Sequence, residues 1–171
     1  MFLELPDGRV HDYDMEFLKD LLELLDGRIE RLSASVPQSV DARGVFESIE
    51  YIIGVGLDAC QSYLATTSND LKVKKDVALK CGPMHPSGLT IVEILNHAAN
   101  FGKYDDEWNL LPPTLCEALD KLFVGDDEYS LTTILRRLVL TRSNRLQALL
   151  PHLHRWRDDL ARTAQTTANP P

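Results

Sequence analysis

Polar, ionisable and aromatic residues that could do chemistry or recognition are concentrated between residues 96 and 108. They are Asn96, His97, Asn100, Lys103, Tyr104, Asp105, Asp106, Glu107 and Trp108. Groups of these types bind a ligand or a partner when they face solvent, and they satisfy one another when the fold buries them. A function of the chain is therefore expected to involve this segment.

The segment is predicted to be a helix that begins at Thr90. Thr90 can cap the first turn, and Glu93 completes a capping box three residues later. Residues four, seven or eleven positions apart then fall on one helix face. The residues on that face are Asn96, Asn100, Lys103 and Glu107, and those on the neighbouring strip are His97 and Tyr104.

Two interpretations of this polar face remain open. In the first, it is a groove that binds a ligand, a nucleotide or a partner protein. The binding residues would then be Asn96, His97, Asn100, Lys103, Tyr104 and Glu107. In the second, it is a buried hydrogen-bond network that joins this helix to the preceding one, since buried amides must find partners.

No metal ion or cofactor is expected. The carboxylates of residues 105–107 could bind a divalent cation, but three successive residues of a helix point to different sides. The three cysteines, Cys60, Cys81 and Cys116, form no C-x-x-C pair. Neither a zinc site nor a disulfide framework is therefore predicted.

Length and charge limit the class of protein. The chain has 171 residues and a formal net charge of -8, which does not suit binding to nucleic acid or to an anionic membrane. No apolar run reaches the roughly 18 residues of a spanning helix. Early acids interrupt any signal-peptide pattern, so a cytoplasmic protein is expected. Its partner would be another protein, of basic surface, or a second copy.

The hydrophobic pattern predicts an all-α fold, a helical bundle of about five helices with a small N-terminal β-hairpin. The hairpin would span residues 2–13 around Pro6-Asp7-Gly8. Helices are expected over about 14–33, 41–64, 90–108 and 114–125, and from Ser130 with a restart at Pro151. The domain would cover residues 1–163, followed by a disordered tail, 164–171.

Particular residues have expected positions in this bundle. Asp14 should cap the first helix, and Asp26 should lie on its polar face. The polar residues 66–69 should end the second helix, and Val77 should point inward from a short lysine-bearing helix. Trp108 should be buried and Trp156, among charged neighbours, less so.

Residues 41–108 resemble the HEPN superfamily, whose members are small helical bundles of bacterial toxin–antitoxin and phage-defence systems. The resemblance lies in an amphipathic helix, a lysine-bearing linker and then Ala99-Asn100-Phe101-Gly102-Lys103-Tyr104-Asp105-Asp106-Glu107-Trp108. In that family an arginine and a histidine four to six positions on form a metal-independent RNA-cleaving site between two copies. Here Ala99 stands at the arginine position and Tyr104 at the histidine position.

This departure removes the groups that cleavage needs, because alanine cannot stabilise a phosphorane and tyrosine is a poor base at neutral pH. The resemblance therefore implies a non-catalytic protein that acts through protein–protein contact, as an immunity, antitoxin or defence-associated component. One alternative is a ribonuclease that uses Arg145 and His152, which repeat the spacing with Pro151 between them, or one that uses Asn100, Lys103 and Tyr104 in a changed mechanism. Another is a structural subunit of a larger assembly.

Overall fold

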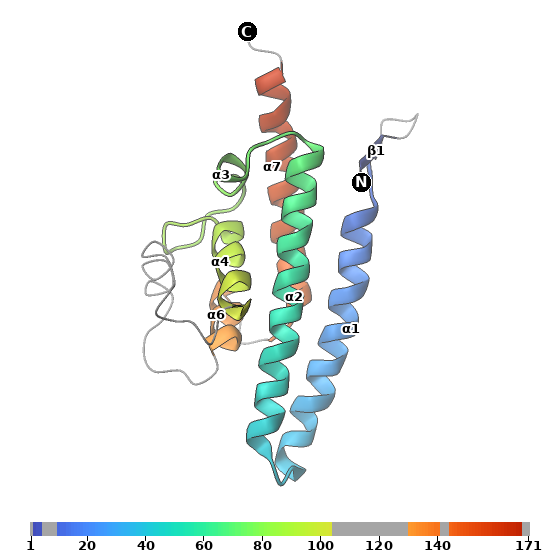
Figure 1. Ribbon diagram of the computed structural model, residues 1–171, viewed down its shortest axis with the longest axis vertical. Coiled ribbons are helices and arrows are strands. Elements are labelled where there is room, and N and C mark those ends of the chain that lie inside the picture. The colour runs from blue at the N-terminus through green and yellow to red at the C-terminus, as the bar shows by residue number, and fades with distance from the viewer. Residues whose placement is uncertain (1, 5–9, 104–129, 141–143, 169–171) are drawn as a thin grey trace.

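The structure is a computed structural model that describes residues 2–4, 10–103, 130–140 and 144–168. Two long helices dominate it: α1 (Tyr13–Ser35) and α2 (Ala42–Asp70). They run antiparallel and are joined by the 3-10 turn η1 (Val36–Gln38). This hairpin of helices supports the rest of the described chain, as Figure 1 shows.

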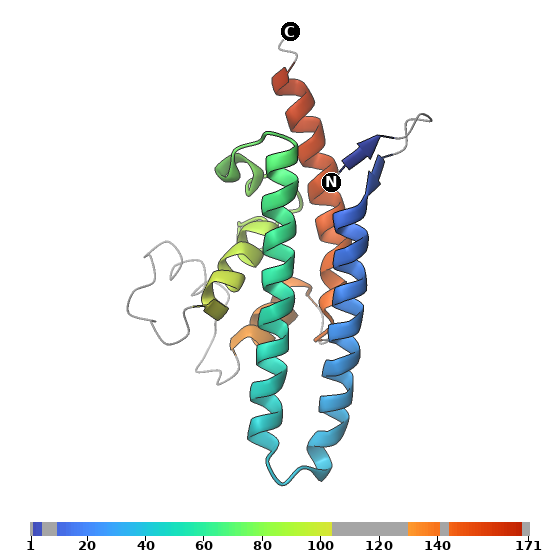
Figure 2. The same ribbon diagram turned by 45° about the vertical axis from the view of Figure 1, so that its right-hand side comes forward.

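The remaining helices pack against this pair and complete an all-α bundle. They are α3 (Lys75–Ala78), α4 (Ile91–Lys103), α6 (Ser130–Leu138), the 3-10 turn η3 (Leu146–Leu149) and α7 (Leu150–Ala168). Figures 1 and 2 place α4 and α6 beside α2, whereas α1 forms the opposite edge of the bundle. None of the helices in the described residues is both long and apolar enough to cross a membrane.

The predicted N-terminal hairpin is present. Strands β1 (Phe2–Glu4) and β2 (Val10–Asp12) pair antiparallel, with Phe2 opposite Asp12. The last residue of β2 is also the cap of α1, because the Asp12 carboxylate accepts a 3.1 Å hydrogen bond from the Met15 N–H. The predicted cap, Asp14, lies instead inside the first turn. The strand therefore passes directly into the helix.

The core lies between the long hairpin and the other helices. Its fully buried members include side chains from every major helix, namely Leu22, Ile53, Leu57, Ile94, Leu95, Ile134, Leu135, Leu138, Leu146 and Trp156. The leucines that recur at helical spacing in the C-terminal region are buried, namely Leu131, Leu135, Leu138, Leu146 and Leu149. Gly56 allows the closest approach: a Cβ added there would lie 2.5 Å from the Cδ1 atom of Leu146.

Three predicted boundaries or orientations are wrong. Helix α2 does not end at residues 66–69 but continues to Asp70, since Thr67 and Ser68 are buried and the Ser68 hydroxyl donates to the carbonyl of Leu64. Helix α7 continues through Ala168, so most of the expected tail, residues 164–168, is helical. In α3 the buried residue is Ala78, whereas Val77 is 43% exposed.

Trp156 is also placed differently from the prediction. Its side chain is fully buried, and the indole Nε1–H donates a 2.8 Å hydrogen bond to the carbonyl of Ala78. Its charged neighbours lie on other faces of the helix: Arg155 is exposed, and Arg157 pairs with Asp12. The predictions for Trp108, for residues 105–107 and for the helix at 114–125 fall outside the described residues.

Acidic side chains of the long hairpin cap the helices that pack on it. Glu50 of α2 accepts hydrogen bonds from the N–H groups of Leu131 and Thr132 at 2.8 and 2.9 Å, at the start of α6. Asp26 of α1 does the same for Leu146 and Gln147 at η3. These carboxylates satisfy N–H groups that a helix leaves without internal partners. Asp26 is therefore buried rather than on the polar face.

Candidate functional site

The polar face of α4 begins with a hydrogen-bond network that joins it to α2. The Nε2 amide of Gln61 donates to the Oδ1 atoms of Asn96 and Asn100, at 3.0 and 2.9 Å. It also lies 3.2 Å from the backbone carbonyl oxygen of Asn96. Asn96 is only 5% exposed. The two asparagines that spacing placed together are thus together, and their acceptors serve the packing of α4 on α2.

Helix α4 is positioned by the cap that the sequence predicts. The Glu93 N–H donates to the Thr90 hydroxyl oxygen at 3.1 Å, and that hydroxyl donates to the carbonyl of Leu79. The carboxylate of Glu93 pairs with the Lys80 ammonium. The cap thus ties α4 to the segment after α3, and the buried residues Ile91, Val92, Ile94, Leu95, Ala98 and Ala99 fix its rotation about its own axis.

The space beside the network is small. A cavity of about 110 Å³ is lined by Gln61, Ser68, Lys75 and Asn96, among others. Ligand sites for small molecules typically measure about 300–1,000 Å³, whereas a cavity of this size holds a few waters. This cavity is therefore too small for a nucleotide. This geometry favours the structural interpretation for Asn96 and Asn100.

His97 lies on the other predicted strip and is half-buried. Burial lowers its pKa, and the nearby Lys80 and Lys75 act in the same direction, while Glu93 opposes them. The imidazole is therefore held in its neutral form more firmly than a free histidine. Lys103 is the last residue of α4; its side chain, and residues Tyr104 and Glu107, lie outside the described residues.

Ala99 occupies the position of the catalytic arginine in the HEPN resemblance. Its side chain is 1% exposed and belongs to the core between α4 and the other helices. An arginine at this point of the helix would direct its guanidinium into apolar packing, where an unpaired charge is costly. Position 99 is therefore a core position in this fold.

The second arginine and histidine pair, Arg145 and His152, also takes part in contacts that hold the fold together. Arg145 precedes η3, and its guanidinium pairs with Glu30 of α1 at 2.5 Å. His152 lies in the first turn of α7, where burial and then Arg155 lower its pKa. Pro151 restarts the helix between them, as its missing N–H predicts.

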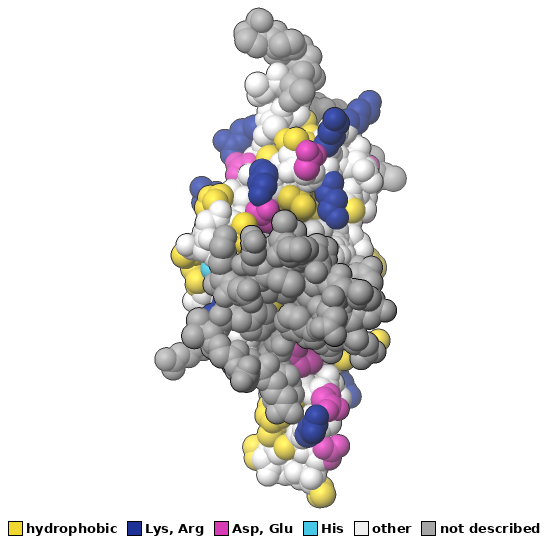
Figure 3. Space-filling view, turned by 60° about the vertical axis from the view of Figure 1, so that its left-hand side comes forward, with side chains coloured by type: hydrophobic (Ala, Val, Ile, Leu, Met, Phe, Trp, Pro, Cys, Tyr) yellow, Lys and Arg dark blue, Asp and Glu magenta, His cyan; other side chains and the backbone are white. Residues whose placement is uncertain are grey.

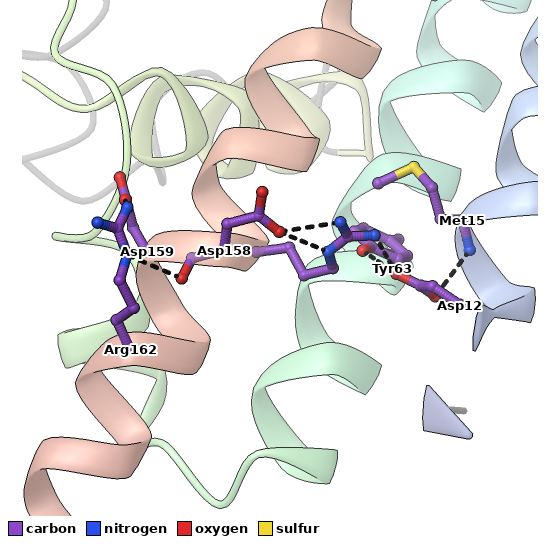
Figure 4. A network of polar contacts seen from close by, with 7 residues as sticks. Asp12, Met15, Tyr63, Asp158, Asp159 and Arg162 are labelled. Atoms are coloured by element: carbon purple, nitrogen blue, oxygen red, sulfur yellow. Dashed lines mark hydrogen bonds and ion pairs between the residues drawn. The ribbon is translucent and has the colours of Figure 1, made fainter. Parts of the chain in front are cut away.

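A buried polar cluster that the sequence did not reveal joins the N-terminus to α2 and α7. Tyr63 donates a 2.7 Å hydrogen bond to the Oδ2 atom of Asp12, and Arg157 contacts the same oxygen at 3.2 Å. Arg157 also pairs with Asp158 at 2.9 Å. Figure 4 shows the side chains of this cluster converging from β2, α2 and α7. The three partners lie far apart in sequence, so no spacing rule could have found them.

The ionisation of this cluster is that of a structural ion pair. Burial raises the pKa of the Tyr63 phenol, and the hydrogen bond to Asp12 raises it further. Burial alone would lower the pKa of Arg157, but its hydrogen bonds to Asp158 and Asp12 raise it overall. With pKa values shifted in this direction, the Tyr63 phenol and the Arg157 guanidinium are poor proton donors at neutral pH. The cluster joins β2 to α2 and α7.

Lysines after α2 form a local basic surface. Lys72, Lys74, Lys75 and Lys80 are exposed, and Figure 3 shows lysine and arginine side chains interspersed with acidic ones above the grey residues. Lys80 is paired with Glu93. Interspersed charges of this kind are typical of a solvated surface.

A hollow of about 450 Å³ lies between the end of the long hairpin and α6, and its lining includes Val36, Phe46 and Ile49. Its size suits a small molecule. Three polar side chains of its lining have partners: the Arg136 Nε–H donates to the Asn144 Oδ1 atom at 2.6 Å, and Thr132 binds Glu50. The described residues supply no buried charge directed into this hollow.

Exposed apolar side chains gather on the outer side of α1 and α2. Arg28 and Leu32 of α1 line one shallow hollow with Ser48, Tyr51 and Ile52 of α2. This shared hollow fixes which side of each helix faces outward. Tyr51 is 75% exposed although it is large and aromatic.

The same surface continues one and two turns further. Leu24 precedes Arg28 by four residues and Val55 follows Tyr51 by four, so both extend the face. Phe17 lies two turns from Leu24 on α1 and is 73% exposed, and Leu24 is 68% exposed. We call this surface the outer face; its residues are Phe17, Leu21, Leu24, Arg28, Tyr51, Ile52 and Val55.

The described residues contain no group of three or more histidine, cysteine, aspartate and glutamate side chains that could hold a metal ion. Cys60 is fully buried, and burial raises the pKa of its thiol to about 12. It is a packing residue rather than a nucleophile. The exposed apolar side chains of the outer face, by contrast, are not explained by internal packing.

Comparison with known proteins finds no matching family model, no matching curated protein and no matching solved structure.

Proposed function

We propose that this chain is a non-catalytic, HEPN-like helical protein that acts by binding another protein through the outer face. The observation that carries the proposal is the exposure of Phe17 and Leu24 on α1 and of Tyr51 on α2, the neighbouring helix. Contiguous apolar surface on a folded protein marks an interaction site more often than isolated exposed residues do. An immunity, antitoxin or defence-associated component would need such a surface and no active site.

The chemistry of the interior supports a binding role over catalysis. The side-chain oxygens of Asn96 and Asn100 accept hydrogen bonds from Gln61. The position that an arginine would need for RNA cleavage holds a buried alanine, Ala99. The net charge of -8 opposes the approach of a phosphate backbone.

The outer face can be tested by site-specific photo-cross-linking in cells of the natural host. A photoreactive residue at position 24 should give a defined adduct, whereas one at Lys19, exposed on the opposite flank of α1, should not. Mass spectrometry identifies whether the adduct contains another protein or a second copy. Equal labelling at both positions would contradict a specific contact through this face.

The absence of catalysis is tested separately with purified protein and labelled RNA. No cleavage is expected. Ribonuclease activity that survives stringent purification and disappears in His152→Ala would overturn the non-catalytic proposal and favour the Arg145–His152 alternative.

A further inference from the structure

We infer that the occupant of the outer face is a second copy of this chain, with the two α1 helices antiparallel across a two-fold axis near Leu24. This inference rests on the proposed function and names its partner. It depends on five exposed residues that share one side of α1. They are Phe17, Leu24 and Arg28, which belong to the outer face, and Asp20 and Arg31, which lie beside them. Successive steps of three, four, four and three residues keep them within one strip.

The strip reads symmetrically about its centre. Asp20 lies four residues before Leu24 and Arg28 four residues after it, while Phe17 and Arg31 lie seven residues before and after. When two such helices run antiparallel with Leu24 against Leu24, Asp20 of each copy faces Arg28 of the other. A two-fold axis generates each contact twice, so one pairing rule gives two ion pairs.

The outer residues of the strip complement one another in the same arrangement. Phe17 of one copy faces Arg31 of the other, and a guanidinium over an aromatic ring is attractive. Arg31 is already oriented along the helix, since its Nε–H donates a 3.0 Å hydrogen bond to the carbonyl of Gly27. A parallel arrangement would instead set Asp20 against Asp20 and Arg28 against Arg28. The charge order therefore selects the antiparallel one.

The position of α1 in the bundle leaves this strip accessible. Helix α1 forms an edge of the described structure in both ribbon views, as Figures 1 and 2 show. The acids on the other flank of α1 are engaged elsewhere: Glu30 with Arg145, Glu16 with His11 and Asp26 with η3. None of these contacts uses a residue of the strip Phe17, Asp20, Leu24, Arg28 and Arg31, whose side chains are exposed.

The test is sedimentation equilibrium of the full chain. Charge reversals at Asp20 and Arg28 are informative because the two-fold axis places each of these residues against the other. The wild-type chain should form dimers at micromolar concentration. Asp20→Arg alone and Arg28→Asp alone should each weaken dimerisation by at least about tenfold, because each replaces two attractive pairs with two repulsive ones. The double variant Asp20→Arg, Arg28→Asp should restore it.

A mixture provides the sharpest outcome. Equal amounts of the Asp20→Arg chain and the Arg28→Asp chain should form a heterodimer, since every facing pair is then again opposite in charge. Lys19→Glu, a reversal on the other flank, should leave dimerisation unchanged. Circular dichroism melting of each variant separates a lost contact from a lost fold.

Several results would overturn the inference. A wild-type chain that stays monomeric up to several hundred micromolar would do so, as would a dimer that tolerates Leu24→Asp or a mixture that does not associate. A monomeric chain whose position 24 cross-links to a different protein would overturn only the identity of the partner. A chain with neither result would overturn the proposed function as well.

Discussion

The carboxylate of Asp26 on α1 accepts a 2.7 Å hydrogen bond from the backbone N–H of Leu146, 120 residues further along the chain. A second bond, from the N–H of Gln147, is 3.1 Å long. Burial raises the pKa of Asp26, and these two N–H groups and Arg145 oppose that rise. A buried acid is thus stabilised by the backbone that it caps. The pairing fixes the start of η3, and with it α7, on the long hairpin.

The first prediction concerns this cap. Asp26→Ala leaves two N–H groups at η3 without acceptors, so the free energy of unfolding should fall by about 1–3 kcal/mol. Urea denaturation monitored by circular dichroism measures the change. Glu23→Ala, an exposed acid on the same helix, should change it by less than about 0.5 kcal/mol. Equal effects of the two substitutions would contradict the cap.

The second prediction concerns the close approach of η3 to α2. In Gly56→Ala, the new methyl group must displace Leu146, which is fully buried. Overpacking of this kind costs about 1–3 kcal/mol, which exceeds the gain of about 1 kcal/mol in helix propensity. Gly27→Ala is the matched control, because its Cβ meets nothing within 4 Å. That control should stabilise the chain in thermal unfolding at low protein concentration.

How far sequence patterns predict this fold depends on what each residue contacts. The helices with long apolar stripes were predicted because side-chain period alone defines them. Leu131, Leu135, Leu138, Leu146 and Leu149 are all buried for that reason. Such features depend on neighbours within the same helix.

The predictions are wrong where a contact with another part of the chain determines whether a residue is buried. Asp26 was assigned to the polar face from its residue type, but its partners lie in η3, and no local pattern links them. Ser68 looked like a helix breaker, whereas its hydroxyl returns to the carbonyl of Leu64 and allows the turn to be buried. Trp156 is different: its spacing from Leu153 and Leu160 did indicate the core side, and its charged neighbours obscured that signal.

The candidate site was predicted in part. The pairing of Asn96 with Asn100 follows from helix geometry, but the residue that joins them, Gln61, lies 35 positions before Asn96. The outer face was not predicted, because its apolar residues flank the core stripes of α1 and α2 and read as their continuation. Exposure, which only the assembled bundle reveals, separates Phe17 and Leu24 from the core.

The third prediction decides between the two interpretations of the α4 face. If Asn96 is a buried network member, Asn96→Ala should reduce the free energy of unfolding by about 1–3 kcal/mol. A double-mutant cycle with Gln61→Ala should give a coupling energy of about 1 kcal/mol, because the two amides contact directly. A stability unchanged by Asn96→Ala would favour the groove. Ser62→Ala, an exposed neighbour on α2, is the control.

The fourth prediction concerns acid. Burial lowers the pKa of His97, His152 and His154 below the usual value of 6.5. The unfolded chain therefore binds protons at a higher pH than the folded chain does. As the pH falls through about 6.5, the unfolded state is favoured, so the free energy of unfolding should decrease between pH 7.5 and pH 5.5. Above this window all three imidazoles are neutral in both states.

The contribution of His97 can be isolated by comparison. His97→Gln keeps an amide of similar length but cannot take up a proton in this range, so its free energy of unfolding should fall less steeply with acid than that of the wild-type chain. The raised pKa of Asp26 acts in the opposite direction, and it cancels when the variant is compared with wild type at each pH. Urea titrations at half-unit intervals give the two slopes. Identical slopes would mean that the folded state does not disfavour the imidazolium of His97. The side chain of His97 would then be more open to water than its half-buried position near Lys80 and Glu93 implies.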